Sequence, residues 1–427
     1  MISSETLTLL TRLLQIDSVE SPALEGMPFG KGNAEALALV LDTMRQWGFD
    51  TVNLDNFCGY AEIGKGDLFG ILCHLDVVPV TDGWSHPPFG AERVGNRIYA
   101  RGAMDDKGPA VAAMTAAKQL LDQGLTPTKR IRFLFGCDEE SGWKCMERYA
   151  ATEEMPAMGF SPDADFPVIN CEKGIVYHTL TMPRPAGVVS LNAGTRANVV
   201  PDAATLIVKD SLCPHMSDFR PVGDGTCRLQ TTGVSSHAAT PEQGKNALTA
   251  LLNLARDVDP LFATLADAFG QTDGSGVSLA LHDAKSGALT LNLGTAETDG
   301  DVIRMQLDVR HPVTMTKEDV TRILKERLSP AIEVKQGFYH LPLYVSPDHP
   351  LVKTLLDAYN EVMHTDARPI TIGGGTYARM LPLGVAFGPC FPGKPSTIHQ
   401  IDEYIDLDDF ERMTQIYRLA LERLCFR

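Results

Sequence analysis

The chain of 427 residues has no apolar run long enough to cross a membrane. Its longest run of small apolar residues, 110–117, contains Thr115 and is far shorter than the roughly 20 residues of a transmembrane helix. Residues 1–17 show no basic start followed by an apolar block, so we expect no signal peptide. Internal repeats and low-complexity segments are also lacking. These absences argue against a membrane protein and favour a globular protein of the cytoplasm.

Positive charge is scarce in this sequence. Lysine and arginine together number 38, against 54 aspartates and glutamates, which gives a formal net charge of −16. Nucleic acids and anionic membranes attract basic surfaces, so we expect neither as a partner. A content of 44% hydrophobic and 22% charged residues is typical of a soluble globular protein, and the length suits two or three domains.

Cys-x-x-Cys spacing is absent, although the chain contains nine cysteines. The odd number and the irregular spacing argue against a thiolate metal site and against a disulfide framework. Cys73 and Cys137 stand at the ends of apolar runs. We therefore expect buried free thiols in a reducing compartment.

The first part of the chain alternates short apolar segments with amphipathic ones. The expected strands are 51–54, 60–63, 69–74 and 130–137, and the expected helices are 5–16, 33–47 and 110–121. This alternation is typical of an α/β fold, in which functional groups follow the carboxyl ends of strands.

The pattern changes in the middle of the chain and later returns. Alternating strands with a few helices, 244–256 and 317–328 among them, indicate an α+β insertion. The predicted architecture is an α/β domain of residues 1–175 and 342–427, with a mixed sheet flanked by helices, interrupted by an α+β domain of residues 176–341.

A buried strand is expected to end in His74, with Asp76 two positions later. In an extended chain these two side chains point to the same side. A carboxylate beside an imidazole fixes its tautomer and makes it a better metal ligand. Taken alone, His74 could equally cap a core strand.

Acidic residues follow several of the other apolar segments. Asp105 precedes an expected helix, where an acid also suits the helix dipole. Glu139 and Glu140 follow the strand 130–137, and Asp163 comes later. Such acids are costly when buried unless a cation neutralises them, whereas on the surface they cost nothing.

Together with His399, these residues form a mixed nitrogen and oxygen donor set that suits zinc, manganese or cobalt. One bridging carboxylate can hold two ions about 3.5–4 Å apart, and the pair then activates a water and polarises a carbonyl. A neighbouring carboxylate that binds no metal must take the proton. The adjacent glutamates allow this division of labour.

The order of these motifs resembles one known family. The motifs are His-Leu-Asp at 74–76, Arg-Gly-Ala-Met-Asp-Asp-Lys-Gly at 101–108, Asp-Glu-Glu-Ser-Gly at 138–142 and the late His399. They are similar to those of the co-catalytic metallopeptidases of the aminoacylase and carboxypeptidase G family. Ser-Pro-Asp-Ala-Asp-Phe-Pro at 161–167, Gly-Gly-Gly-Thr-Tyr at 373–377 and the long insertion resemble the bacterial PepV-type dipeptidases within it.

The resemblance implies a zinc-exopeptidase-like catalytic domain that hydrolyses short peptides, dipeptides foremost, with two divalent ions per chain. Zinc is the first choice, and manganese or cobalt are alternatives. The implied roles are as follows: His74 and Asp163 hold one ion, Glu140 and His399 hold the other, Asp105 bridges them, Asp76 orients His74, and Glu139 is the general base. The peptide bond between Asp105 and Asp106 is expected to be cis.

The resemblance also assigns roles within the insertion, which would act as a lid. His237 would stabilise the oxyanion, Asn198 would reach the substrate, and Arg310 would bind the substrate carboxylate. Backbone N–H groups of Gly374, Gly375 and Thr376 would contact the same carboxylate. The enlarged lid implies a monomer that closes about hinges near residues 175 and 342.

Simpler interpretations of these residues remain open from the sequence alone. Without the resemblance, His237 would be interpreted first as a surface histidine, Arg310 as part of a solvated ion pair, and the glycines as a tight turn. His178, His282, His340 and His364 are interpreted as structural or surface residues, and His86 is undecided. The same chemistry also serves N-acyl amino acid or succinyl-diaminopimelate deacylases, and a non-catalytic metal- or peptide-binding protein is a further hypothesis.

Overall fold

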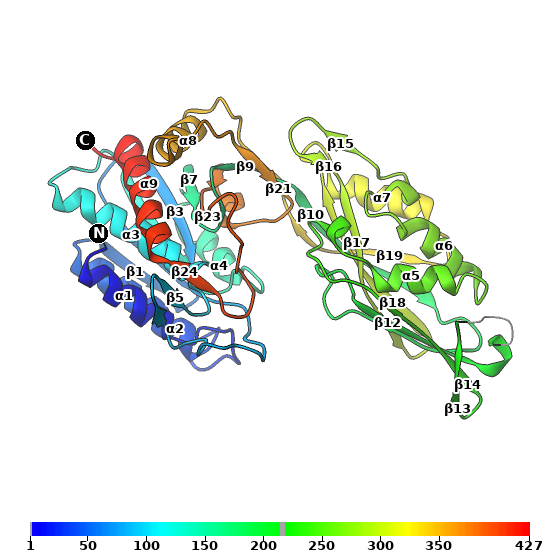
Figure 1. Cartoon of the computed structure of the whole chain (residues 1–427). Coiled ribbons are helices and arrows are strands. Elements are labelled where there is room, and N and C mark those ends of the chain that lie inside the picture. The colour runs from blue at the N-terminus through cyan, green and yellow to red at the C-terminus, as the bar shows by residue number, and fades with distance from the viewer. Residues whose placement is uncertain (1, 214–217) are drawn as a thin grey trace. The chain divides into compact units, whose positions relative to one another are not determined.

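The computed structural model describes residues 2–213 and 218–427, which fold into two compact units (Figure 1). The first unit consists of Met1–Asn170, Val345–Ile370 and Thr376–Arg427. The second consists of Cys171–Tyr344 and Thr371–Gly375. Each unit has its own cluster of buried apolar side chains, as expected for separate domains.

The first unit is built around a mixed sheet. Its strands run in the order β1 (Asp50–Leu54), β2 (Cys58–Ile63), β6 (Arg130–Gly136), β3 (Leu68–His74), β7 (Met158–Ser161), β22 (Leu383–Ala386) and β9 (Ile169–Glu172). β3 pairs in parallel with both β6 and β7, whereas β1, β2 and β6 pair antiparallel. Every residue of β3 is buried, which explains its continuous apolar sequence.

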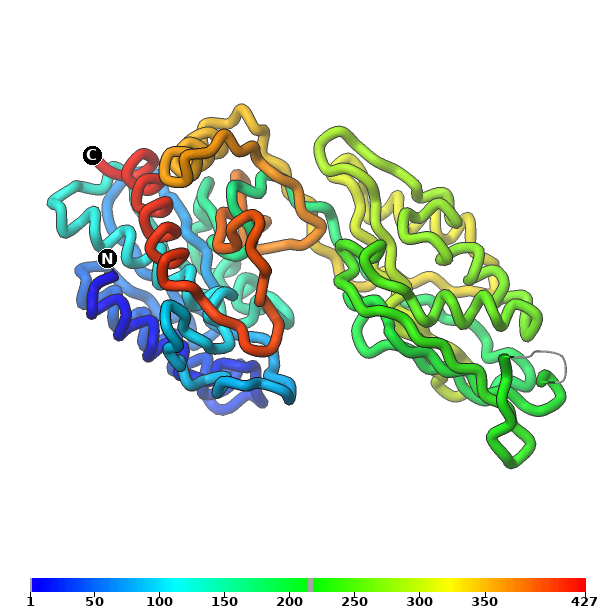
Figure 2. Tube along the Cα trace, viewed as in Figure 1, coloured from blue at the N-terminus to red at the C-terminus, as the bar shows by residue number. Residues whose placement is uncertain are grey.

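Helices flank this sheet, and the trace in Figure 2 shows how they surround it. They are α1 (Ser4–Leu14), α2 (Lys31–Gln46), α3 (Lys107–Asp122), α4 (Lys144–Thr152), α8 (Pro350–Met363) and α9 (Leu407–Cys425). α3 packs against α9 and β3, and its many buried alanines permit this close approach. α2 packs against β1 and β2, and α8 packs against α9.

Smaller elements complete the first unit. A three-stranded sheet has the order β24 (Tyr404–Asp406), β5 (Arg97–Tyr99) and β4 (Glu92–Val94). β8 (Ala164–Asp165) pairs with β23 (Pro389–Cys390), and the 3₁₀ helix η4 spans Tyr377–Met380. β21 (Ile370–Ile372) pairs with β9.

The parallel strands determine where the acidic and histidine motifs lie. His74 at the end of β3 pairs with Gly136 at the end of β6, and Ser161 ends β7 beside them. Because carboxyl ends of parallel strands share one edge of a sheet, the segments that follow these strands start close together. The α/β architecture predicted from the sequence is therefore confirmed.

The second unit contains an antiparallel sheet with helices packed against it. The order is β13 (Arg220–Gly223), β14 (Thr226–Thr232), β12 (Ala203–Lys209), β11 (Val188–Ala193), β17 (Thr290–Asp299), β18 (Val302–His311), β10 (Gly174–Pro183) and β19 (Glu333–His340). The helices are α5 (Ala247–Leu254), α6 (Pro260–Phe269) and α7 (Lys317–Arg327). Further short elements are β15 (His282–Asp283), β16 (Gly287–Ala288), β20 (Leu343–Tyr344), η1 (Asp210–Leu212), η2 (Pro241–Gln243) and η3 (Ser275–Val277).

The core of the second unit lies between these helices and one face of the sheet. Alternate residues of β10, Val176, Leu180 and Met182, belong to this core together with Leu251 of α5 and Leu324 of α7. Period-two burial along the strands is typical of a sheet with one covered face. The α+β character predicted for this part of the chain is present.

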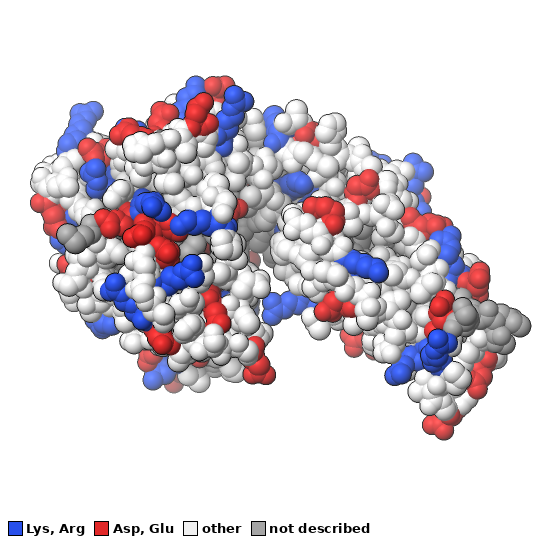
Figure 3. Space-filling view, in the orientation of Figure 1, with Lys and Arg blue, Asp and Glu red and all other residues white. Residues whose placement is uncertain are grey.

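Figure 3 shows the charged side chains on one face of the molecule. Acidic and basic side chains are interspersed on that face of the described residues. None of the helices that the structure describes is both long enough and apolar enough to cross a membrane.

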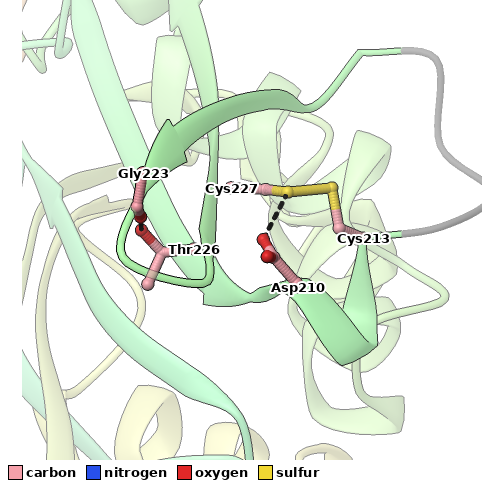
Figure 4. The surroundings of a disulfide bond; sticks show 5 residues. All are labelled: Asp210, Cys213, Gly223, Thr226 and Cys227. Carbon is pink, nitrogen blue, oxygen red and sulfur yellow. Dashed lines mark hydrogen bonds between the residues drawn. A yellow bond between two sulfur atoms is a disulfide. The ribbon is translucent and has the colours of Figure 1, made fainter.

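A disulfide between Cys213 and Cys227 corrects the prediction that all cysteines are free thiols (Figure 4). It joins the end of η1 to β14, and Asp210 approaches the Cys227 sulfur. Cys58, Cys73, Cys137, Cys145, Cys171, Cys390 and Cys425 are free and buried, as predicted. The pair is 14 residues apart with no motif, so the strand pairing of the second unit, rather than the sequence, brings it together.

Reduction of this disulfide is expected to destabilise the second unit. Closing a loop of this length removes chain entropy from the unfolded state worth about 3 kcal/mol. Urea unfolding with and without reductant should show this loss, and the variant Cys213→Ser/Cys227→Ser should unfold identically in both conditions. Alkylation of all nine cysteines in the unfolded, unreduced protein would contradict the pairing.

Candidate metal centre

Two histidines face the two oxygens of one carboxylate in the first unit. His74 Nε2 lies 2.8 Å from Asp105 Oδ1, and His399 Nε2 lies 2.8 Å from Asp105 Oδ2. Asp105 is buried, and so is His74, whereas His399 is partly accessible, with 48% of its side chain exposed. The Asp105 carboxylate therefore lies between two imidazole nitrogens, which is the arrangement of a bridging ligand.

Each histidine also lies near a second carboxylate. His74 Nε2 is 3.6 Å from Asp163 Oδ1, and His399 Nε2 is 2.9 Å from Glu140 Oε1. Ligand atoms of His74, Asp105 and Glu140 all lie within 4.8 Å of one another, as do those of His74, Glu139 and Asp163. The structure thus brings together the whole predicted ligand set.

These side chains come from loops at one edge of the sheet and from the start of a helix. His74 ends β3, Asp105 lies two residues before α3, Glu139 and Glu140 follow β6, and Asp163 follows β7. The peptide bond between Asp105 and Asp106 is cis, as predicted.

His399 reaches the site from a loop before β24, with a left-handed backbone (φ 62°).

Asp76 connects His74 with the two glutamates. His74 Nδ1 donates to the main-chain oxygen of Asp76 (2.9 Å). The carboxylate of Asp76 lies farther from this nitrogen (3.7 Å). With the proton on Nδ1, the Nε2 lone pair faces the site as a metal ligand requires. The Asp76 carboxylate instead accepts the backbone N–H groups of Glu139 and Glu140, both at 3.0 Å.

The carboxylates of the site repel one another. Burial and the charge of Asp163 raise the pKa of Glu139 well above its ordinary value, and burial raises the pKa of Asp163 to about 7. Burial alone would lower the pKa of His399, but Asp105 and Glu140 outweigh it and raise this pKa to about 11. A compact set of nitrogen and oxygen donors with excess negative charge fits divalent cations of the zinc, manganese or cobalt type.

A second group of predicted residues gathers within the second unit. The bridge between Val199 and His237 places Asn198 beside His237, and the Asn198 carbonyl accepts the Ala238 N–H (2.9 Å). The Ala239 N–H donates to His237 Nδ1 (3.2 Å), which leaves the proton of the neutral ring on Nε2. His237 is exposed.

Arg310 lies in the same unit, at the end of β18. Its Nε and Nη2 donate to Asp308 Oδ1 and Oδ2, both at 2.7 Å, and its Nη1 donates to the Gly373 carbonyl (2.9 Å). The Gly373 backbone also lies close to Ala239, which connects the glycine segment with the His237 loop.

Gly374 and Gly375 continue this segment, and the Thr376 hydroxyl that follows accepts the Ala378 N–H at the start of η4.

Comparison with known protein families identifies the family of this chain. The family described as Peptidase family M20/M25/M40 matches residues 70–423. The chain belongs to this family. It is therefore a metal-dependent hydrolase of peptide bonds, which agrees with the resemblance found in the motifs.

Relatives of this peptidase match over nearly their whole length. A Bacillus subtilis protein named "Putative dipeptidase YtjP" is 42% identical over 96% of this chain and 95% of its own. "Putative dipeptidase SSP1012" of Staphylococcus saprophyticus is 36% identical, over 97% and 96%. Among solved structures, the M20 family metallo-carboxypeptidase Sso-CP2 of Sulfolobus solfataricus has a TM-score of 0.63 at 19% identity and covers 98% of this chain and 99% of its own, which shows a shared fold.

Two buried charged residues of the peptidase that lie next to the candidate ligand Asp105 were not singled out from the sequence. Arg101 and Glu403 form a buried ion pair at 2.7 Å beneath the Asp105 loop. Arg101 opens the same motif that supplied Asp105, and Glu403 follows His399 by four positions. The available signal was one basic residue, Arg101, in the motif that contains Asp105, and one acidic residue, Glu403, shortly after His399.

Proposed function

We propose that this protein is a dipeptidase that uses two divalent cations and requires a free carboxylate on its substrate. His74 and Asp163 would hold one cation, Glu140 and His399 the other, and Asp105 both. The observation that carries this proposal is the position of Asp105, with one oxygen 2.8 Å from each histidine. The dipeptidase names of relatives at 42% and 36% identity support the choice of substrate.

Divalent cations bound there, zinc first and manganese or cobalt as alternatives, would lower the pKa of a water and polarise the scissile carbonyl. Glu139 would accept the proton of the attacking water and then deliver it to the leaving amine. Its backbone is held on both sides, because its N–H donates to Asp76 and its carbonyl accepts the Trp143 indole N–H (2.9 Å). A fixed backbone keeps such a base in place during the reaction.

Residues of the second unit, which we propose to act as a lid, would bind the rest of the substrate. His237 would donate its Nε2–H to the developing oxyanion, and Asn198 beside it would contact the substrate. Arg310 has five N–H donors, of which the bonds to Asp308 and Gly373 use three. The Nη edge of the guanidinium would bind the substrate carboxylate, together with the N–H groups of 374–376.

The same proposal includes a monomer in the cytoplasm. Sedimentation of the purified protein should then give the mass of one chain, and a stable dimer would contradict it. Disulfides such as Cys213–Cys227 are uncommon in reducing compartments. Whether these two cysteines are oxidised or reduced in cells therefore tests the proposed location of the protein.

A substrate panel tests the proposed activity. Dipeptides, the same dipeptides with an amidated carboxyl end, and N-acyl amino acids are assayed with added zinc or manganese. We expect turnover of the free dipeptides and little of the amides. Higher kcat/KM for N-acyl amino acids would instead assign the protein as a deacylase.

Replacing Arg310 by methionine is expected to lower kcat/KM for dipeptides by about 10–100-fold, mainly through KM. The lost bonds to a charged group are each worth about 1.5–3 kcal/mol. Arg304→Met on the same strand is the matched control, because Arg304 is exposed and pairs only with surface Asp299 among the described residues. Equal effects of the two substitutions would contradict the assigned role.

A further inference from the structure

We propose that Glu403 is a positioning residue that locks the loop of Asp105 to the loop of His399 and thereby sets the affinity of the metal centre. The inference rests on the proposed function, in which these two residues are ligands. Glu403 itself touches neither the cations nor the substrate in this account.

Both oxygens of the Glu403 carboxylate accept hydrogen bonds from the Asp105 loop, residues 101–105. Oε1 accepts the backbone N–H groups of Met104 (2.8 Å) and Asp105 (3.3 Å). Oε2 accepts Nη1 of Arg101 (2.7 Å) and the backbone N–H of Gly102 (3.2 Å). The Glu403 side chain is completely buried, so water does not compete for these bonds.

Two further hydrogen bonds run from the segment before α3 to main-chain carbonyls of the His399 loop. Arg101, only 2% exposed, also donates to the carbonyl of Gln400 (3.2 Å), the residue next to His399. The Ala100 N–H donates to the main-chain carbonyl of Glu403 (2.9 Å). One ion pair and several backbone bonds thus join a segment before α3 to a segment before β24.

A carboxylate suits this position better than a neutral side chain. Three backbone N–H groups of the 102–105 segment donate to it, close to the positive end of α3. An amide would offer one oxygen and one N–H₂ group, and the latter would face donors instead of acceptors. Removing the charge would also leave Arg101 buried without its partner.

The His399 loop requires such restraint because of its backbone. His399 (φ 62°) and Asp402 (φ 54°) both have left-handed conformations, which are unfavourable for side chains with a Cβ. Asp402 fastens the loop a second time, accepting the N–H (2.8 Å) and the hydroxyl (2.5 Å) of Ser85. Among the hydrogen bonds of the described residues, those to the Asp105 loop come from Glu403 and not from Asp402.

The test compares Glu403→Gln with Asp402→Asn, a matched loss of charge one residue away that spares the Asp105 loop. Zinc alone is titrated into metal-free full-length protein in competition with a chromophoric chelator. Loss of a residue that orients a ligand typically lowers metal affinity by 10–100-fold. We expect a loss of this size for Glu403→Gln in at least one zinc-binding step, with less than about threefold for Asp402→Asn and with kcat recovered at high zinc.

Separate outcomes distinguish this inference from the proposed function. If the unaltered protein binds no zinc, the metal centre itself is wrong. If it binds two ions and folded Glu403→Gln binds them with unchanged affinity, the positioning role is wrong and the centre stands. Should Glu403→Gln not fold, Arg101→Met/Glu403→Leu removes both buried charges together. This variant is expected to fold and to bind zinc more weakly, and unaltered zinc affinity would overturn the inference.

Discussion

Replacing Glu139 by glutamine is expected to lower kcat for dipeptides by about 10³–10⁴-fold while both cations remain bound. The amide keeps the size of the side chain but cannot accept a proton, so a general-base contribution at the upper end of the usual range is lost. The ligands assigned to the cations are unchanged in this variant. Its steady-state kinetics and its metal content, measured on the same sample, check both halves of the expectation.

A neighbouring acid serves as the control for this substitution. Glu147 on α4 is exposed and belongs to the segment that follows the same strand, so Glu147→Gln makes the same chemical change away from the site. We expect it to leave kcat unaltered. Turnover by Glu139→Gln within tenfold of the unaltered enzyme would remove Glu139 from the mechanism, and loss of a cation would make it a ligand instead.

Asp105→Asn is expected to lower both the number of bound cations and kcat, the latter by at least about 10³-fold. The carboxylate presents one oxygen to each histidine, whereas asparagine presents an oxygen to one and an N–H₂ group to the other. An amide also brings no negative charge to the centre. Elemental analysis after dialysis against a fixed zinc concentration measures the loss directly.

Asp122→Asn at the opposite end of α3 controls for a general effect on that helix. Asp122 is exposed and pairs with Lys118, so we expect its replacement to leave both metal content and kcat unchanged. Two cations bound to Asp105→Asn with normal affinity would show that another residue bridges them.

Much of the fold follows from patterns that the sequence displays. The helix expected at 317–328 is α7, Lys317–Arg327, whose Thr316 and Asp319 form a capping box. The strand expected at 69–74 is β3, where continuous apolar residues reflect burial on both faces. The capping residues of α7 and the apolar run of β3 are strong local signals, and both elements form where these signals predict them.

Other elements were missed or displaced, each for a physical reason. α3 begins at Lys107 rather than at 110, because the turn that includes Asp106 leads directly into the helix. α6 (Pro260–Phe269) was not predicted, although Asp259 caps it and proline occupies its first turn. The short α4, Lys144–Thr152, starts after a left-handed Trp143 and has no side-chain cap to announce it.

The candidate site also contains residues that could be predicted from the sequence and contacts that could not. Histidines and acids at strand ends could be found from the sequence because each motif is local. The contact of Arg101 with Glu403 spans 302 positions, and the Cys213–Cys227 pair depends on strand register. The bond from His74 to the main-chain oxygen of Asp76 involves no side-chain acceptor, so residue type carries no information about it. Such long-range and backbone contacts arise only from the folded chain.

Anomalous diffraction from crystals of the zinc-loaded protein tests the central claim most directly. We predict two zinc peaks about 3.5–4 Å apart, one contacted by His74 and Asp163 and the other by Glu140 and His399, with an Asp105 oxygen at each. A single peak, or two peaks that do not share Asp105, would contradict the account.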